Sequence, residues 1–74
     1  MTKRNYSIAP APLWRYVIMN FVRNPHHKKV LMARIIDGKT LACVAMEQGY
    51  SESQVFRIVK KYEGMLFDKV KHYL

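Results

Sequence analysis

Five polar side chains lie within one short stretch of the chain, and their types form hydrogen bonds with the edges of bases. They are Ser51, Glu52, Ser53, Gln54 and Arg57. An arginine can donate two parallel hydrogen bonds to guanine, a glutamine can pair with adenine, and a glutamate can accept from cytosine. Two of the five also have simpler explanations, because Gln54 could belong to a helix cap and Glu52 could serve only the helix dipole.

Positively charged residues surround this stretch and are suited to contact with phosphate. Lys60 and Lys61 follow it, and Lys39 and Thr40 precede it at the predicted start of another helix. Thirteen Lys and Arg residues against five Asp and Glu give the chain a net charge of +8. An excess of this size indicates a polyanionic partner, either nucleic acid or an anionic membrane.

The first twelve residues, 1–12, are polar and then proline-rich, which predicts a flexible basic arm. Lys3 and Arg4 in this arm could enter a neighbouring minor groove, as basic arms do in homeodomains. The alternative is a terminus that makes no contact with a partner. Pro12 suits the first position of a helix, so the folded domain is predicted over residues 13–74.

The elements that must position the polar stretch are two short helices joined at Gly49. Ala45 provides a small residue where the second helix crosses the first, and Gly49, four residues later, tolerates a positive φ. Val55 and Ile58 provide apolar anchors that point back from the second helix, and Val44 is the matching anchor on the first. This spacing predicts a helix-turn-helix over residues 41–60.

The start of the second helix is specified in detail. Ser51 is a good N-cap, and Gln54 three residues later completes a capping box. Tyr50 and Val55 can form a hydrophobic staple across the cap. A helical projection places Val55 on an apolar side and the basic residues on the opposite side. A recognition helix over about residues 52–63 is therefore predicted.

The stretch from Leu41 to Lys60 resembles the helix-turn-helix of bacterial and phage DNA-binding proteins. The segment 51–55 is similar to the start of recognition helices in region 4 of sigma factors and in site-specific invertases and resolvases, and the spacing of Gly38, Thr40 and Ala45 is also similar. The resemblance is specific for the motif and assigns no single family. It implies that the second helix lies in the major groove of double-stranded DNA.

Helical periodicity and capping signals divide the rest of the chain. They predict an all-α domain, a small bundle of four to five helices that contains the helix-turn-helix. The fourth helix either stops near Gly64 or continues, kinked, to Tyr73. The four predicted helices cover residues 13–23, 26–37 and 41–48 and a segment that begins after Ser51.

The C-terminal segment 65–74 is more apolar than a solvent-exposed tail. Surplus apolar surface on a small domain often becomes a subunit interface, so we expect a homodimer. The alternative is that this segment folds back and completes the core of the monomer. The residues that motivate the dimer are Trp14, Met19, Val22, Leu66, Val70 and Tyr73.

Other kinds of site find little support in the sequence. His26, His27 and His72 lack nearby ligands at metal spacing, so we expect no metal and no cofactor, and residues 26–29 form a basic, pH-sensitive patch. Cys43 is predicted to be a small buried hydrophobe. Catalytic constellations are missing, so we expect no enzyme. Because no apolar run approaches the length of a membrane span, the sequence predicts a cytoplasmic, nucleoid-associated protein with no small-molecule ligand.

Together these features predict a sequence-specific double-stranded DNA-binding protein that regulates transcription. One alternative is a DNA-binding accessory factor of a plasmid or phage in partition, conjugation, recombination or packaging. Another is a protein-interaction module that binds a larger machine such as RNA polymerase through Trp14, Met65, Leu66 and Phe67. Only a DNA-binding protein would lose affinity for DNA steeply as salt rises.

Overall fold

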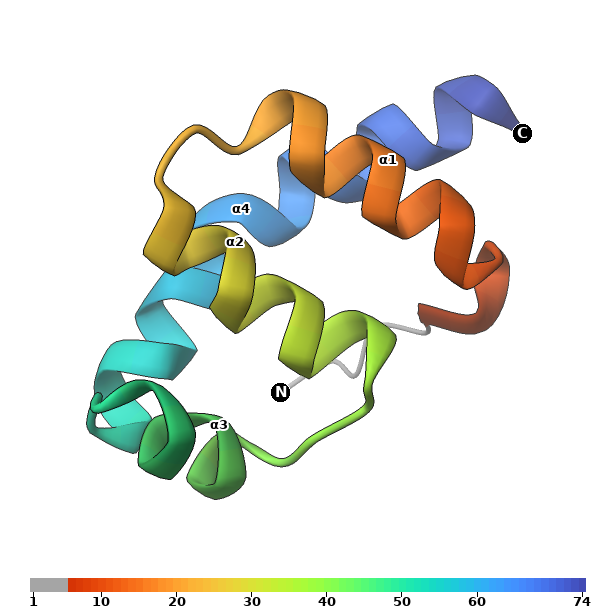
Figure 1. The fold of residues 1–74 in the computed structure, drawn as a ribbon. Coiled ribbons are helices and arrows are strands. Elements are labelled where there is room, and N and C mark those ends of the chain that lie inside the picture. Colours follow the sequence, from red (N-terminus) through yellow and green to blue (C-terminus); the bar gives the residue numbers. More distant parts are fainter. Residues whose placement is uncertain (1–5) are drawn as a thin grey trace.

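Helices make up almost all of the described chain. The computed structural model describes residues 6–74, and within them it contains four α-helices and no strand (Figure 1). The prediction of a small all-α bundle is therefore confirmed. The elements are the 3-10 helix η1 (Tyr6–Ile8), α1 (Ala11–Phe21), α2 (Pro25–Leu31), the π-helical segment η2 (Met32–Ile36), α3 (Leu41–Gln48) and α4 (Glu52–Tyr73).

Two of the helix starts are capped by side chains. Asn24 precedes α2, and its side-chain oxygen accepts hydrogen bonds from the backbone N–H groups of His26 and His27 at 2.9 and 3.3 Å. Thr40 precedes α3, and its hydroxyl accepts from the N–H of Cys43 at 3.1 Å. Each cap satisfies backbone donors that a helix leaves without intrahelical partners.

The second predicted helix is not a regular α-helix to its end. After Leu31 the chain widens into η2, where the N–H of Asp37 donates to the carbonyl of Met32 at 3.1 Å. A π-helical turn holds one more residue than an α-helical turn. Ala33 and Ile35 are both buried in this segment. Gly38 then ends the segment with a φ of 69°.

Residues 6–12 of the predicted flexible arm pack on the domain, and its part over residues 1–5 lies outside the described residues. Tyr6 packs its ring against Trp14 and Phe67, with centroids 5.7 and 5.5 Å apart. The indole N–H of Trp14 donates to the carbonyl of Tyr6 at 2.7 Å, and the Tyr6 hydroxyl donates to Glu63 at 2.7 Å. These contacts bury aromatic surface, which holds residues 6–12 on the domain.

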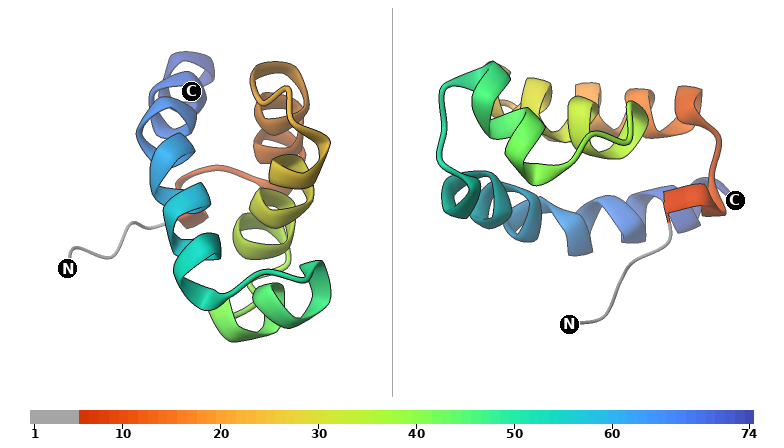
Figure 2. Two further views of the ribbon diagram at one scale, coloured as in Figure 1. Left: turned by 90° about the vertical axis from the view of Figure 1, so that its left-hand side faces the viewer. Right: turned by 90° about the horizontal axis from the view of Figure 1, so that it is seen from below.

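Helix α4 forms one side of the bundle, and α1, α2 and α3 all pack against it (Figure 2). It runs without interruption through Gly64 from Glu52 to Tyr73, so of the two predicted endings the longer is correct. At about 1.5 Å per residue, these 22 residues span roughly 33 Å. The two ends of α4 therefore lie far apart on the molecule.

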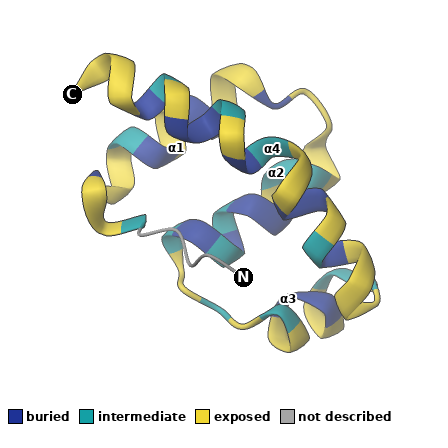
Figure 3. Ribbon diagram, turned by 180° about the vertical axis from the view of Figure 1, so that it is seen from behind, coloured by how far each residue is buried: buried dark blue, intermediate teal, exposed yellow. Residues whose placement is uncertain are grey.

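The C-terminal half of α4 completes the core of the single chain. Leu66, Phe67 and Val70 are buried there, and Trp14 on α1 is only 2% exposed (Figure 3). Val22, directly after α1, is buried as well. Most of the apolar residues that motivated a dimer therefore serve the monomer, because the C-terminal segment folds back on α1. Of the four residues expected to bind a partner machine, Trp14, Leu66 and Phe67 are buried in the core and Met65 is partly buried.

Candidate nucleic-acid interface

The turn between α3 and α4 has the geometry that its sequence predicts. Gly49 has a φ of 75°, and its N–H donates to the carbonyl of Ala45. The N–H of Tyr50 donates to the same carbonyl at 2.9 Å, which satisfies the end of α3 in the manner of a Schellman motif. All four predicted anchors of this corner are buried: Val44, Ala45, Val55 and Ile58. A rigid corner thus holds the start of α4 in place.

The predicted capping box at the start of α4 is present. The side-chain oxygen of Gln54 accepts from the N–H of Ser51 at 2.8 Å, and the N–H of Gln54 donates to the Ser51 hydroxyl at 3.2 Å. The Gln54 amide oxygen is therefore engaged within the helix cap. A two-bond contact between Gln54 and adenine would compete with this bond.

All five predicted base-contacting residues are exposed on the first turns of α4 or at its cap. Glu52, Ser53 and Arg57 border a hollow of about 440 Å³ together with Leu41 and Phe56. This hollow lies between the start of α3 and the start of α4. The fold therefore brings three of the five predicted residues together around one concave surface, whereas Ser51 and Gln54 lie outside its lining.

Phe56 is a candidate contact residue that the sequence reasoning did not single out. Its side chain is half-buried, lines the hollow, and lies 5.7 Å from the ammonium of Lys60, measured to the ring centroid. Phenylalanine can make apolar contact with the methyl group of thymine. The sequence did offer a signal, because Phe56 directly follows the apolar anchor Val55. Consecutive residues of a helix point about 100° apart, so Phe56 points away from the core.

The predicted phosphate contacts at the start of α3 are already engaged. The ammonium of Lys39 bonds both carboxylate oxygens of Glu47 at 2.9 Å. This hydrogen bond raises the pKa of Lys39, with the burial of the ammonium opposing it and the charge of Glu47 adding to it. The Thr40 hydroxyl oxygen caps α3 and retains its own proton for donation. A phosphate at this point would compete with Glu47 for Lys39.

Lys60 and Lys61 project from the exposed side of α4, about two and a half turns beyond the cap. Lys60 lies 3.9 Å from Glu63, a long ion pair with a carboxylate that also accepts from Tyr6. The ammonium of Lys61 lies 5.4 Å from the ring centroid of Tyr62. Both ammonium groups remain accessible to a polyanion.

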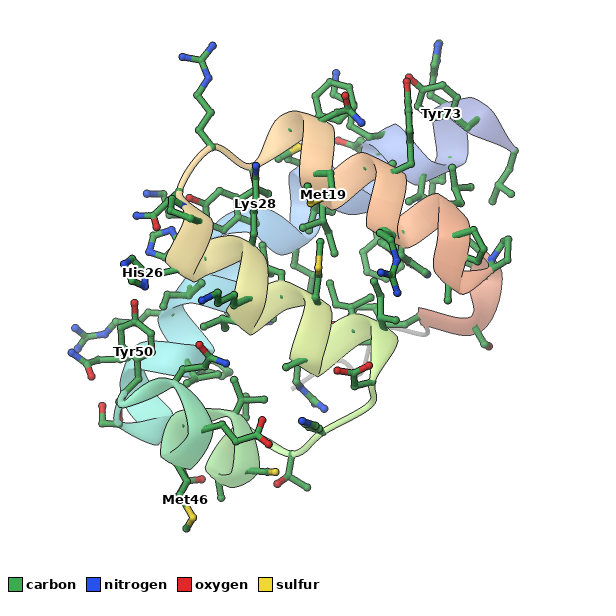
Figure 4. The ribbon with its side chains drawn as sticks, in the orientation of Figure 1. Met19, His26, Lys28, Met46, Tyr50 and Tyr73 are labelled. Carbon is green, nitrogen blue, oxygen red and sulfur yellow. The ribbon has the colours of Figure 1, made fainter. Side chains whose placement is uncertain are left out.

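A histidine joins α2 to the middle of α4. Nδ1 of His27 and the hydroxyl of Tyr62 are 2.7 Å apart and share a hydrogen bond. Burial lowers the pKa of His27, and the positive charges of Lys61 and His26 lower it further. The basic patch predicted at residues 26–29 therefore lies beside α4, and Figure 4 shows His26 and Lys28 pointing outward from α2.

Other predicted sites have different outcomes. Cys43 is exposed on α3, so its prediction as a buried hydrophobe is wrong; the buried residues of α3 are Val44 and Ala45. Lys3 and Arg4 lie outside the described residues. Among residues 6–74, no three histidine, cysteine or carboxylate side chains meet as a metal-ligand group. The described helices include none with the length and apolar character of a membrane span.

Comparison with known proteins gives no match to a family model, to a curated protein or to a solved structure.

Proposed function

We propose that this protein binds double-stranded DNA with sequence preference and inserts the start of α4 into the major groove. The observation that carries the proposal is the exposed polar surface on the first turns of α4, held by the buried corner around Gly49. Helix-turn-helix proteins use the same part of their second helix to contact base edges.

Arg57 is the principal base-reading residue in this proposal. Its side chain is exposed beside Ser53 on the hollow, and its guanidinium can donate two hydrogen bonds to guanine. Glu52 and Ser53 are exposed beside it and supply an acceptor and a hydroxyl. Gln54 contacts a base only when its side chain leaves the capping box. The Ser51 hydroxyl, which accepts a hydrogen bond in that box, contributes by donating its proton.

Phosphate contacts supply most of the affinity and come from two places. Lys60 and Lys61 lie along α4, and Thr40 lies at the start of α3 beside Lys39, which contributes only where its ammonium leaves Glu47. Electrostatic contacts of this kind fix the register of a protein on DNA without reading its sequence. The net charge of +8 favours association with a polyanion at long range.

The proposed role is regulation of transcription by a nucleoid-associated protein. An accessory role in plasmid or phage DNA transactions uses the same groove chemistry and is the second candidate. Mapping of bound genomic fragments separates the two, because promoter sites support regulation whereas replicon or recombination sites support the accessory role.

The assembly proposed on DNA is a homodimer, formed through apolar side chains that the monomer leaves exposed. Tyr16, Met19 and Phe21 on α1 are exposed, and Tyr73 and Leu74 at the end of α4 are exposed near them. The rings of Tyr16 and Tyr73 pack edge to face with centroids 5.6 Å apart. This surface lies at the opposite end of α4 from the recognition turns, so both could be occupied together (Figure 4).

A titration against selected and random duplexes tests the proposal. DNA fragments enriched from a random pool supply the selected duplex, and fluorescence anisotropy measures its affinity at several salt concentrations. We expect tighter binding to the selected duplex and a steep loss of affinity as salt rises. Equal affinity for both duplexes would exclude sequence preference, and affinity independent of salt would exclude DNA binding by this surface.

A further inference from the structure

Helix α2 lies alongside the middle of α4, next to the proposed recognition turns. The hydrogen bond of 2.7 Å between His27 and Tyr62 joins the two helices, and their rings pack with centroids 5.4 Å apart. Figure 2 shows α2 and α4 side by side, with α3 across the start of α4. The first turn of α2 therefore has a fixed position relative to the recognition helix.

The surface at this junction is positively charged and carries no compensating acid. The sequence of α2 contains His26, Lys28 and Lys29 and no acidic residue, and Lys61 of α4 adjoins it. In the described chain, ion pairs join Lys39 to Glu47 and Lys60 to Glu63, whereas Lys29 and Lys61 have no carboxylate partner. Like charges held together without counter-charges raise the local positive potential.

The lowered pKa of His27 accords with this positive potential. Burial has the largest effect on its pKa, and the charges of Lys61 and His26 add to the lowering from two different helices. A group that resists protonation because of its neighbours lies in a positive field. An approaching phosphate would relieve the same repulsion.

On each of the two helices, two basic side chains lie on one side of that helix. His26 and Lys29 are three residues apart and thus lie on one side of α2, while Arg57 and Lys61 are four residues apart and lie on one side of α4. In Figure 4, His26 points to the same side of the molecule as Tyr50, which precedes the recognition helix. Lys28 points elsewhere, toward the loop between α1 and α2.

We propose that His26 and Lys29 of α2 join Lys61 of α4 in one phosphate-binding surface, which holds the DNA backbone beside the groove entered by the start of α4. This inference rests on the proposed DNA binding and adds α2 to the interface. Because α2 lies along the middle of α4 and α3 lies across its start, the two elements would contact different phosphates. The protein would therefore span a longer segment of backbone than the helix-turn-helix alone.

The test compares variants that each remove one positive charge. Lys29→Ala and Lys61→Ala alter the proposed surface, and Lys71→Ala is the matched control, because it lies about ten residues and roughly 15 Å beyond Lys61 along α4. Anisotropy titrations with the selected and random duplexes give the slope of log affinity against log salt concentration. Circular dichroism confirms that each variant is folded, and Lys29→Arg shows whether the charge alone is sufficient.

We expect Lys29→Ala and Lys61→Ala each to weaken binding to both duplexes and to reduce the salt slope by about 0.9. Lys71→Ala and Lys29→Arg should keep the wild-type slope. The inference is overturned if Lys29→Ala behaves like Lys71→Ala, whether both are silent or both lose the same affinity. That failure is distinct from failure of the proposed function, in which the wild-type protein itself would not prefer the selected duplex.

Discussion

At the scale of single residues, the side chains on α4 differ in how free they are to meet DNA. Arg57 is exposed and borders the hollow, whereas Gln54 is held in the capping box. The sequence predicted that box from two residue types at the right spacing. The sequence did not predict the ion pair between Lys39 and Glu47. The two residues are eight positions apart, with Lys39 before α3 and Glu47 in its last turn.

Arg57→Ala tests the recognition surface directly. Loss of a two-bond contact to guanine should cost roughly 1–3 kcal/mol on the selected duplex and relax the sequence preference. Anisotropy titrations of both duplexes measure this difference. Lys71→Ala serves as the control for a general loss of charge, and unchanged discrimination in Arg57→Ala would show that another surface reads the bases.

Glu47→Gln tests whether Lys39 is held away from phosphate. The substitution removes the carboxylate that binds the Lys39 ammonium, so we expect tighter, more salt-dependent binding to both duplexes. The companion variant Lys39→Ala should have little effect in the wild-type background and should abolish the gain in the Glu47→Gln background. If Glu47→Gln binds DNA as the wild type does, Lys39 plays no part in the interface.

At the scale of elements, glycine suits the turn between α3 and α4 but is unfavourable inside the long helix α4. Gly49 has a φ of 75°, and an added Cβ there would meet no other atom within 4 Å, so only the backbone conformation requires glycine. Gly64 lies inside α4, has no positive φ and also has open space around it. Glycine in a helix interior is less favourable than alanine because it loses more chain entropy on folding.

The two glycines therefore make a matched prediction for the free energy of unfolding. Gly49→Ala should destabilise the protein by about 1–2 kcal/mol, because an L-residue is strained at that φ. Gly64→Ala should stabilise it by roughly 0.5–1 kcal/mol. Chemical denaturation followed by circular dichroism gives both values, and a destabilised Gly64→Ala would mean that α4 is kinked in solution.

The element boundaries show where sequence reasoning succeeds and fails. The limits of α3 and the start of α4 were correct because caps and a positive-φ glycine are local signals. The π-helical η2 was missed because capping signals and apolar periodicity do not mark a single widened turn. The docking of Tyr6 was missed because its partner Phe67 lies far along the chain.

At the scale of the whole molecule, the junction of α2 with α4 should make stability depend on pH. The folded protein lowers the pKa of His27 below its ordinary value of 6.5. The unfolded chain then binds a proton more readily than the folded one, so the contribution to stability is complete above about pH 6.5 and is lost as pH falls through the folded pKa.

Denaturation midpoints between neutral and mildly acidic pH measure this effect. The wild type should lose stability as the pH falls below 6.5, and His27→Gln should lose less over the same range. His72→Gln is the control, because His72 is exposed near the far end of α4 and takes no part in the lowered pKa of His27. Equal pH dependence in His27→Gln and the wild type would assign the loss to other groups.

Assembly is the remaining whole-molecule prediction. Because Met19 is half-exposed on α1 near the paired rings of Tyr16 and Tyr73, Met19→Asp should disrupt an apolar subunit contact without disturbing the core. Sedimentation equilibrium should show a dimer for the wild type and a monomer for this variant. Met46→Asp is the matched control, because Met46 is 86% exposed on α3 at a distant point of the surface (Figure 4). A monomeric wild type at micromolar concentration would contradict the dimer.

The burial of Trp14 has a practical consequence for every one of these measurements. It is the single tryptophan of the chain, and it is enclosed by Tyr6 and Phe67 and joined to the Tyr6 carbonyl. Its emission should therefore shift to longer wavelength when the chain unfolds and water reaches the indole. Because the ring is buried against the C-terminal half of α4, away from the recognition turns, the protein carries an intrinsic optical probe of folding that bound DNA should leave undisturbed.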